Sequence, residues 1–462
     1  MTSVPPSAPT PLLPIPSERQ LAWHKLEMYA FCHFGMNTFT GREWGDGTES
    51  PELFQPTELD CRQWARVLKD AGFKGIIITA KHHDGFCLWP SRYTTHSVAH
   101  TSWGDGKRDV VGELAAACRE YGLKFGVYLS PWDRHEPSYG DSPRYNEHYE
   151  NQLTELLTNY GEVFEVWWDG ACGEGPNGKR QEYDWRSYEE LVRRLQPKAV
   201  IFSDAGPDVR WVGNEQGFAG ETNWCMQRRD DFAPGKVADL SLLTHGQKDG
   251  THWVPAECDV SIRPGWFYHS EQDAQVKSVE QLVDIYFKSV GRNASLLLNV
   301  PPDRRGLIAE PDVQRLLEFR GALDAIFARD LAREAKAVAN CVRGGDARFA
   351  AERAIDGLPG SYWATDDGVL TGSLTITWRE TVQFSVVMLQ ENIELGQRVE
   401  EFSIEARVGG QWQEVARGTT IGYERLLRIL VVEADGLRVN ILGARACPTI
   451  STVSVFAPPS RP

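Results

Sequence analysis

A single carboxyl group ends one of the most apolar stretches of the chain. In "VFEVWWDG", residues 163–170, a run of β-forming residues stops at Asp169 and a glycine, which is the pattern of a buried strand that turns into a loop. Alternation along the strand places Trp167 and Asp169 on one face and Trp168 on the other. Such an acid is either a turn residue or the nucleophile of a glycosidase, which needs a carboxylate at the anomeric carbon in a pocket that excludes water.

A glycosidase of this kind also needs a second carboxyl group, which protonates the leaving oxygen. The candidates that the sequence offers are Glu43, Asp204, Glu215, Glu221, Glu257 and Asp259. The segment "RWVGNEQG", residues 210–217, singles out Glu215, because it places this acid beside Trp211 in a glycine-flanked loop that we expect to follow the fifth strand. From the residues alone the choice among the six stays open.

Two adjacent histidines and an aspartate, His82, His83 and Asp84, end another apolar run. Consecutive strand residues point to opposite faces, so two such histidines chelate one ion only if the strand has already become a loop. No HxH, HExxH or third spaced histidine accompanies them. We therefore favour hydroxyl recognition or structural hydrogen bonding over metal binding for this pair and predict no metal site.

These polar groups follow β-rich runs that alternate with helical stretches. We predict strands at 28–35, 75–85, 124–133, 163–170, 199–204, 252–260 and 294–303, and helices near 61–71, 110–121, 145–160, 185–195 and 279–290. About eight such units predict an α/β fold, a closed (β/α)₈ TIM-like barrel whose C-terminal strand ends form the active site. A doubly wound open sheet is the alternative, but "HFGMNTFTG" is not the phosphate-binding turn that it needs.

The chain divides into three segments by composition. We expect a Pro-rich leader at 1–20, a catalytic barrel at 21–330 and a C-terminal β-sandwich at 338–459, where short strands are separated by turns with no helix between them. A long Gly- and Trp-rich insertion runs from the predicted strand at 199–204 to about residue 251.

The composition excludes some classes of protein. The 64 acidic against 49 basic residues give a formal net charge of -15, which argues against a nucleic-acid partner. No run approaches the roughly 20 apolar residues of a membrane helix, so no membrane association is expected. The leader lacks the pattern of a signal peptide, which predicts a cytoplasmic protein as written, or a periplasmic or secreted one if a targeting segment has been removed. The nine cysteines, in no metal-binding or paired spacing, indicate reduced thiols.

Several motifs together resemble a known family. In chain order, "HFGMNTF", "ITAKHHDGFCLWPS", "FGVYLSPWD", "EVWWDG", "GNEQG", "SIRPGWFYH" and "LLLNVPPD" resemble glycoside hydrolase family 29, the retaining α-L-fucosidases, and in particular the subgroup that cleaves α-1,3 and α-1,4 fucosyl branches of Lewis-type glycans. The resemblance implies that Asp169 is the nucleophile and Glu215 the acid/base. It also implies a set of substrate-binding residues, to which the strand parity adds Trp167: His33, His82, His83, Tyr128, Trp132, Trp167, Arg263, Trp266, Glu43 and Trp44.

The resemblance implies a retaining exo-α-L-fucosidase that acts by double displacement on fucosylated oligosaccharides or glycoconjugates and needs no metal or organic cofactor. A non-catalytic glycan-binding protein, or the same scaffold acting on another sugar or on an α-1,2 linkage, remains the alternative. The C-terminal segment resembles a discoidin-like or carbohydrate-binding β-sandwich, for which sugar binding and structural support are equally open. The oligomeric state is not predicted.

Overall fold

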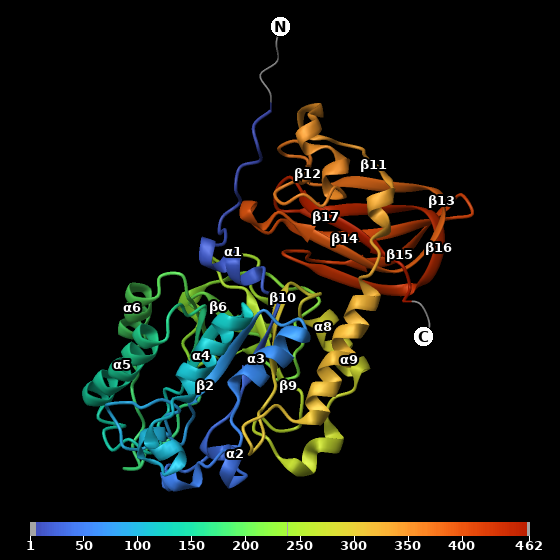
Figure 1. Ribbon diagram of the computed structural model, residues 1–462. Helices are drawn as coiled ribbons and strands as arrows, with labels where there is room; N and C mark the ends of the chain where they lie inside the picture. The colour runs from blue at the N-terminus through green and yellow to red at the C-terminus, as the bar shows by residue number, and fades with distance from the viewer. Residues whose placement is uncertain (1–5, 238, 460–462) are drawn as a thin grey trace.

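The computed structural model describes residues 6–237 and 239–459. It confirms the predicted fold class, a closed parallel barrel followed by an antiparallel β domain, and the β domain stacks against one end of the barrel (Figure 1). The barrel closes in the order β1-β10-β9-β6-β5-β4-β3-β2. Its strands are β1 (Met28–Cys32), β2 (Gly75–Lys81), β3 (Lys124–Leu129), β4 (Glu165–Trp167), β5 (Val200–Ser203), β6 (Val209–Trp211), β9 (Ala256–Ser261) and β10 (Ala294–Asn299).

The helices cover the outside of the barrel, as their sequences require. Each has an apolar side that packs on the strands, and most begin at an aspartate or serine whose side chain accepts a backbone N–H, as Asp60, Asp109, Asp184 and Ser278 do. The five predicted helices agree with the structure to within three residues at each end. The outer helices are α3 (Cys61–Asp70), α4 (Val110–Tyr121), α5 (Ser142–Asn159), α6 (Trp185–Leu195), α8 (Val279–Lys288) and α9 (Glu310–Ile326).

One barrel strand lies inside the segment that we expected to be an insertion. The three-residue strand β6 follows β5 directly, without a helix between them, and it pairs in parallel with β5 on one side and β9 on the other. Three residues are too few to show a hydrophobic period, so the pattern did not reveal the strand. The predicted strand at 252–260 is in fact two strands, β8 (His252–Trp253) and β9, of which β8 pairs with β7 (Met226–Gln227) outside the barrel.

Two short helices lie in the connections that follow strands β1 and β6. Helix α2 (Met36–Thr40) follows β1, and α7 (Leu240–His245) lies in the long connection between β6 and β9. This connection, residues 212–255, also contains the β7-β8 hairpin.

The C-terminal domain is one hydrogen-bonded antiparallel sheet rather than two separate ones. Its order is β12-β17-β13-β16-β14-β15, with β11 added beside β13. The two long strands, each of 20 residues, carry register shifts that bend them, so the sheet folds around a single apolar core. The strands are β11 (Lys336–Ala339), β12 (Trp363–Ala364), β13 (Gly372–Glu391), β14 (Val399–Val408), β15 (Gln411–Gly418), β16 (Arg425–Ala444) and β17 (Thr449–Phe456).

The described part of the Pro-rich leader is an ordered strap along the β domain (Figure 1). The amide of Leu12 donates to the carbonyl of Leu395 at 2.9 Å, and the Arg398 guanidinium donates to the carbonyl of Thr10 at 2.7 Å. Residues 1–5 of the predicted leader lie outside the described residues. The strap leads into α1 (Glu18–His24) at the N-terminal end of the barrel. Among the described residues no helix has the length and apolar character needed to cross a bilayer.

Candidate active site

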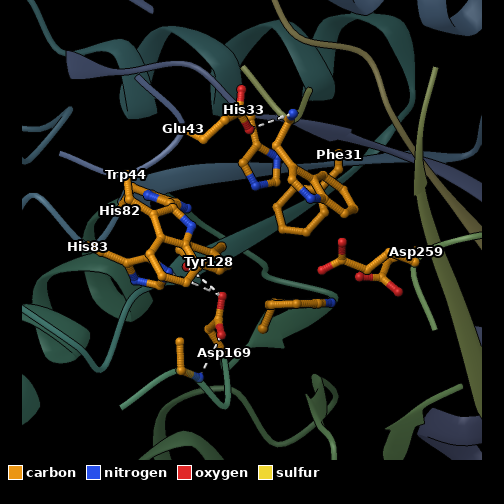
Figure 2. A pocket seen from close by; sticks show the side chains of 13 residues that line it. Phe31, His33, Glu43, Trp44, His82, His83, Tyr128, Asp169 and Asp259 are labelled. Carbon is orange, nitrogen blue, oxygen red and sulfur yellow. Dashed lines mark hydrogen bonds and ion pairs between the residues drawn. The ribbon is translucent and has the colours of Figure 1, made fainter. Parts of the chain in front are cut away.

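A cavity of about 230 Å³ opens among the loops at the C-terminal ends of the barrel strands (Figure 2). It is smaller than the roughly 300 Å³ at which pockets for drug-sized ligands begin, so it suits a single small ring. The structure brings ten of the twelve predicted site residues to its wall. The lining consists of Phe31, His33, Glu43, Trp44, His82, His83, Tyr128, Trp167, Asp169, Ala171, Glu215, Asp259 and Trp266.

Asp169 lies two residues beyond β4, where the chain leaves the barrel. Its Oδ1 accepts the backbone N–H of Ala171 at 2.8 Å and its Oδ2 accepts the phenolic O–H of Tyr128 at 3.0 Å. Burial and the negative charge of Asp169 raise the pKa of Tyr128 well above its ordinary value, so the phenol keeps its proton and remains a donor. The carboxylate is thus oriented from two sides, with part of its surface open to the cavity.

Aromatic rings form the floor beneath this carboxylate. As the strand parity predicted, Trp167 points into the barrel, where it stacks on Phe202 with ring centroids 4.1 Å apart, and Trp168 packs outward against Trp185 of α6. The indole N–H of Trp167 donates to Glu257 at 2.8 Å. This hydrogen bond fixes the rotation of the ring that lies under the sugar-sized space.

Glu257 forms a buried pair with Glu165 deep in the barrel. Glu257 accepts hydrogen bonds from Trp167 and from the hydroxyl of Tyr29, and Glu165 accepts the indole N–H of Trp23 at 3.1 Å. Burial and the neighbouring carboxylate raise the pKa of Glu165 well above its ordinary value. Because Glu257 already accepts from two donors, we place the proton of the pair on Glu165. This arrangement explains how an inward acid at position 165 is tolerated.

His33 is a neutral hydrogen-bond acceptor towards the cavity. The amide of Asn299 donates from Nδ2 to Ser261 and to the carbonyl of Trp266, so its Oδ1 must face His33, and the ring Nδ1 of His33 lies 2.9 Å from that oxygen. Nδ1 therefore carries the hydrogen, and Nε2 has a free lone pair. Burial lowers the pKa of His33 to about 3, so the ring stays uncharged near neutral pH.

His82 and His83 both line the cavity because β2 ends at Lys81, one residue before them. Ser130 donates to the carbonyl of Trp132 and accepts from Nδ1 of His83 at 2.7 Å, which leaves Nε2 of His83 as an acceptor. The amide of Asn37 donates to Nδ1 of His82 at 3.4 Å, which leaves Nε2–H of His82 as a donor. Burial lowers the pKa of both rings.

The three imidazoles therefore offer two acceptors and one donor, without charge. A hydroxyl group both donates and accepts, so this set matches a polyhydroxylated, uncharged ligand better than an anion. Across residues 6–237 and 239–459 no three His, Cys, Asp or Glu side chains are arranged to hold a metal ion.

A loop over residues 41–49 forms one side of the entrance. The carboxylate of Glu43 accepts the backbone N–H of Trp266 at 2.8 Å and the ring N–H of His269 at 2.7 Å, so it joins this loop to the one that follows β9. Beside it, the ring of Trp44 is 57% exposed and meets the rings of His83 and Trp132 edge to face. An exposed indole at the entrance is suited to stacking on a further sugar unit.

Glu215 also lines the cavity, from the loop that follows β6 and not β5 as the sequence predicted. Partial burial raises its pKa, and the carboxylates of Asp169 and Glu43 add to this effect, while a hydrogen bond from Trp266 opposes it. A raised pKa favours the protonated form of the carboxyl group, which is the form that a general acid needs.

Asp259, one of the six candidate acids, is a third carboxyl group of the cavity. Its Oδ1 accepts the indole N–H of Trp211 at 2.8 Å, and Figure 2 shows it across the cavity from His82 and His83. Burial raises its pKa well above the ordinary value, and so does the nearby charge of Glu215. Of the remaining candidate acids, Glu43 lines the cavity, whereas Asp204, Glu221 and Glu257 do not.

Two predicted binding residues lie outside the lining. The guanidinium of Arg263 is bound to Asp312 at 2.9 Å and to Asp273 at 2.8 Å, and it stacks on the ring of Tyr268. Trp132 packs behind His83, with ring centroids 4.9 Å apart, and donates its N–H to the carbonyl of Glu174. Both side chains support the residues that form the wall.

Two lining residues were missed by the sequence reasoning. Phe31 precedes His33 by two residues, so the parity of β1 would have placed both on the same inward face. Ala171 had no signal, because its part in the site is a backbone N–H in the loop after Asp169.

Comparisons with known proteins agree with this chemistry. Residues 15–323 match the family model described as Alpha-L-fucosidase. Alpha-L-fucosidase 1 of Arabidopsis thaliana is 47% identical over 452 residues, which cover 97% of this chain and 88% of the plant protein. Plasma alpha-L-fucosidase of Homo sapiens is 27% identical over 277 residues, 58% of this chain and 54% of the human one.

A solved structure is similar over both domains. The structure of a Ruminococcus gnavus GH29 fucosidase in complex with fucose superimposes with a TM-score of 0.90 at 36% sequence identity, covering 98% of this chain and 96% of that chain. The cavity with its paired carboxyl groups, the match of the family model and the similarity over nearly the whole length lead to one conclusion: this chain belongs to the alpha-L-fucosidase family of glycoside hydrolases.

Proposed function

We propose that the protein is a retaining exo-α-L-fucosidase that releases terminal fucose from α-1,3 and α-1,4 branches of Lewis-type glycans by double displacement. Asp169 attacks the anomeric carbon, and Glu215 gives its proton to the departing oxygen. A fucosyl-enzyme forms, and Glu215 then removes a proton from water, which attacks the same carbon and frees Asp169. The configuration at the anomeric carbon is retained because it inverts twice.

The observation that supports this proposal best is that Asp169 and Glu215 line one cavity of about the size of a sugar ring, and that their surroundings suit them to different roles. The Asp169 carboxylate is oriented by Tyr128 and the Ala171 amide, as a nucleophile requires. The pKa of Glu215 is raised by its partial burial and by the charges of Asp169 and Glu43, as a general acid requires. Two carboxyl groups, one in surroundings that suit a nucleophile and the other in surroundings that suit a general acid, are typical of a glycosidase.

The remaining lining residues suit fucose, which is uncharged and carries a methyl group at C5. The neutral rings of His33, His82 and His83 supply acceptors and a donor for the hydroxyl groups. Phe31 and Trp167 supply apolar surface for the methyl group and the ring face. The Ruminococcus gnavus relative, solved in complex with fucose, supports the same glycone for this chain.

The branched-glycan specificity is supported by the resemblance of the "GNEQG" segment to one subgroup and by Trp44 at the entrance. A branched substrate places a second sugar beside the scissile bond, where an exposed indole can stack on it.

The test of the reaction is the Asp169→Ala variant with a 4-nitrophenyl α-L-fucoside. We expect its rate to fall by several orders of magnitude, since the nucleophile is lost, while the wild type releases nitrophenol. A wild type that binds fucose without releasing nitrophenol would make the protein a lectin. Proton NMR of the early product should show α-fucose; β-fucose appearing first would exclude retention.

The test of specificity compares a Lewis trisaccharide with a 2-fucosyllactose-type substrate. We expect cleavage of the former only. Equal cleavage of both would refute the linkage assignment and leave the fucosidase activity in place.

A further inference from the structure

The loop that carries Glu215 belongs to the long connection between β6 and β9. Asn214 organises its tip, accepting the N–H of Gln216 and donating to the carbonyl of Phe218. The hydroxyl of Thr244, in α7, donates to the carbonyl of Val212 at 2.9 Å. The position of Glu215 therefore depends on β6 and on how this connection, residues 212–255, is held.

Hydrogen bonds of Arg210 hold strand β6 on its outer side. Its neighbours Val209 and Trp211 pack inside the barrel, and Arg210 points outward and is fully buried. Its acceptors in the described part of the chain are three neutral oxygens, the carbonyls of Leu243 and Val254 and the side-chain oxygen of Asn223 at 2.7 Å. A buried guanidinium needs each of these hydrogen bonds, because the loss of one leaves a buried N–H group without an acceptor, which destabilises the fold.

Asn223 is held in turn by the β domain. Its N–H donates to the hydroxyl of Thr420 at 2.8 Å, and its carbonyl accepts the amide of Gln397 at 2.9 Å. Gln397 also accepts the N–H of Cys225 at 2.8 Å, so one side chain spans both ends of the segment 223–225. Asn223, Thr420 and Gln397 are all at least 99% buried, so water does not replace these bonds.

The β domain does not approach the cavity itself. Its bonds to residues beside the barrel strands lie at the N-terminal ends of those strands, where Asn293, next to β10, donates its N–H to the carbonyl of Glu424, and the hydroxyl of Tyr423 donates to Glu27, just before β1. Its other bonds reach α8, through Arg428, and the connection 212–255, through residues such as Thr419 and Arg425. Figure 1 shows the β domain at the end of the barrel remote from α2. Any effect of this domain on catalysis must therefore pass through the barrel.

We propose that the β domain positions the acid/base: Thr420 and Gln397 fix Asn223, Asn223 fixes Arg210, and Arg210 fixes the end of β6 from which the Glu215 loop extends. This inference rests on the proposed role of Glu215. It assigns to Thr420 and Gln397 the role of positioning residues and makes the β domain part of the catalytic unit, distinct from a sugar-binding module.

The test uses the full chain with Thr420→Val and Gln397→Met combined, since both substitutions keep the size of the side chain and remove its hydrogen bonds. The substrates are phenyl and 2,4-dinitrophenyl α-L-fucosides. Phenolate is a poor leaving group and needs the proton of Glu215, whereas dinitrophenolate leaves without it. We expect kcat/KM for the phenyl fucoside to fall about tenfold more than for the dinitrophenyl fucoside.

Equal losses on both substrates, or no loss on either, would overturn the inference. Arg428→Ala is the control: it removes other contacts between the domains, namely the hydrogen bond to the carbonyl of Val283, the ion pair with Asp284 and the stacking on Phe287, none of which reaches Asn223. It should show no dependence on the leaving group. If thermal unfolding shows that the double variant does not fold, Thr420→Val alone is measured in the same way, with the same two outcomes.

Glu215→Ala, measured on the same pair of substrates, separates the two proposals. If this variant loses activity equally on both fucosides, the acid/base role of Glu215 itself is wrong. If it discriminates strongly between them and the double variant does not, only the role of the β domain fails.

Discussion

The hydroxyl of Tyr128 donates to Oδ2 of Asp169 at 3.0 Å, from a strand next to the one that Asp169 follows. β3 and β4 pair in parallel with Tyr128 opposite Trp167, so the phenol rises beside the indole and reaches the carboxylate above it. The Asp169 carboxylate, the proposed nucleophile, is thus oriented by the register of two strands as well as by its own loop.

Removal of this hydroxyl should slow the reaction without disturbing the fold. A hydrogen bond to a charged group contributes about 1.5–3 kcal/mol, so we expect Tyr128→Phe to lower kcat/KM by about tenfold to a hundredfold. Tyr160→Phe is a matched control, because it removes a similar bond, from a phenol to Asp109 at 2.8 Å, between two residues that do not line the cavity. Activity of Tyr128→Phe within twofold of the wild type would show that Asp169 does not depend on the phenol.

The pH dependence of kcat/KM should report the protonation of Glu215, the proposed general acid. Glu215 must hold its proton to act, so activity should be lost as the pH rises through its raised pKa. The charge of Glu43 contributes to that rise, and Glu43→Gln should therefore move the alkaline limb of the profile to lower pH. If the alkaline limb of this variant stays at the same pH or moves to higher pH, Glu215 is not the group that the limb reports.

The buried pair of Glu165 and Glu257 should make the fold less stable at higher pH. The folded pKa of Glu165 is raised above its unfolded value of about 4.3, so the folded state binds the extra proton, and stability falls as the pH rises from that value through the folded pKa. Glu165→Gln keeps an oxygen that can accept the N–H of Trp23 and has no proton to lose. We expect the Tm of this variant, relative to the wild type, to increase between pH 5 and pH 8, and a constant or decreasing difference would place the proton elsewhere.

A second buried pair supports the histidines. Lys81 is fully buried, its ammonium group lies 2.9 Å from Asp133, and it also donates to Gln152. Lys81→Met should cost about 3–5 kcal/mol in urea unfolding, because it leaves the Asp133 carboxylate buried without its cation. Adding Asp133→Asn should recover part of this loss. A double variant no more stable than the single one would mean that the pair does not account for the effect.

The fold could be predicted from the sequence wherever an element was long enough to show its period. Helices such as α4 and α6 begin and end where their patterns and caps indicate. The barrel strand β6 could not be predicted, because its three residues carry no period and its place is decided by pairing with β5 and β9. As a result Glu215 was assigned to the wrong strand, although the residue itself lies in the cavity.

The positions of site residues were predictable on strands, where side chains alternate between the two faces, and less so in loops, where the backbone path sets the direction of each side chain. Trp167 and Trp168 lie on the expected sides because alternation is a property of the backbone. Arg263 illustrates the opposite case: a loop arginine can bind a ligand or an acid, and only the fold shows that Asp312 and Asp273 surround it. The shared orientation of His82 and His83 likewise depends on β2 ending at Lys81.

The strap over residues 6–17 has a consequence for synthesis on the ribosome. It binds residues such as Leu395 and Arg398, nearly four hundred positions further along the chain. During translation the strap is synthesised before the segment that contains Leu395 and Arg398, so the surface that receives it forms only after that segment has been made. Docking of the strap therefore follows the synthesis and folding of the β domain that binds it.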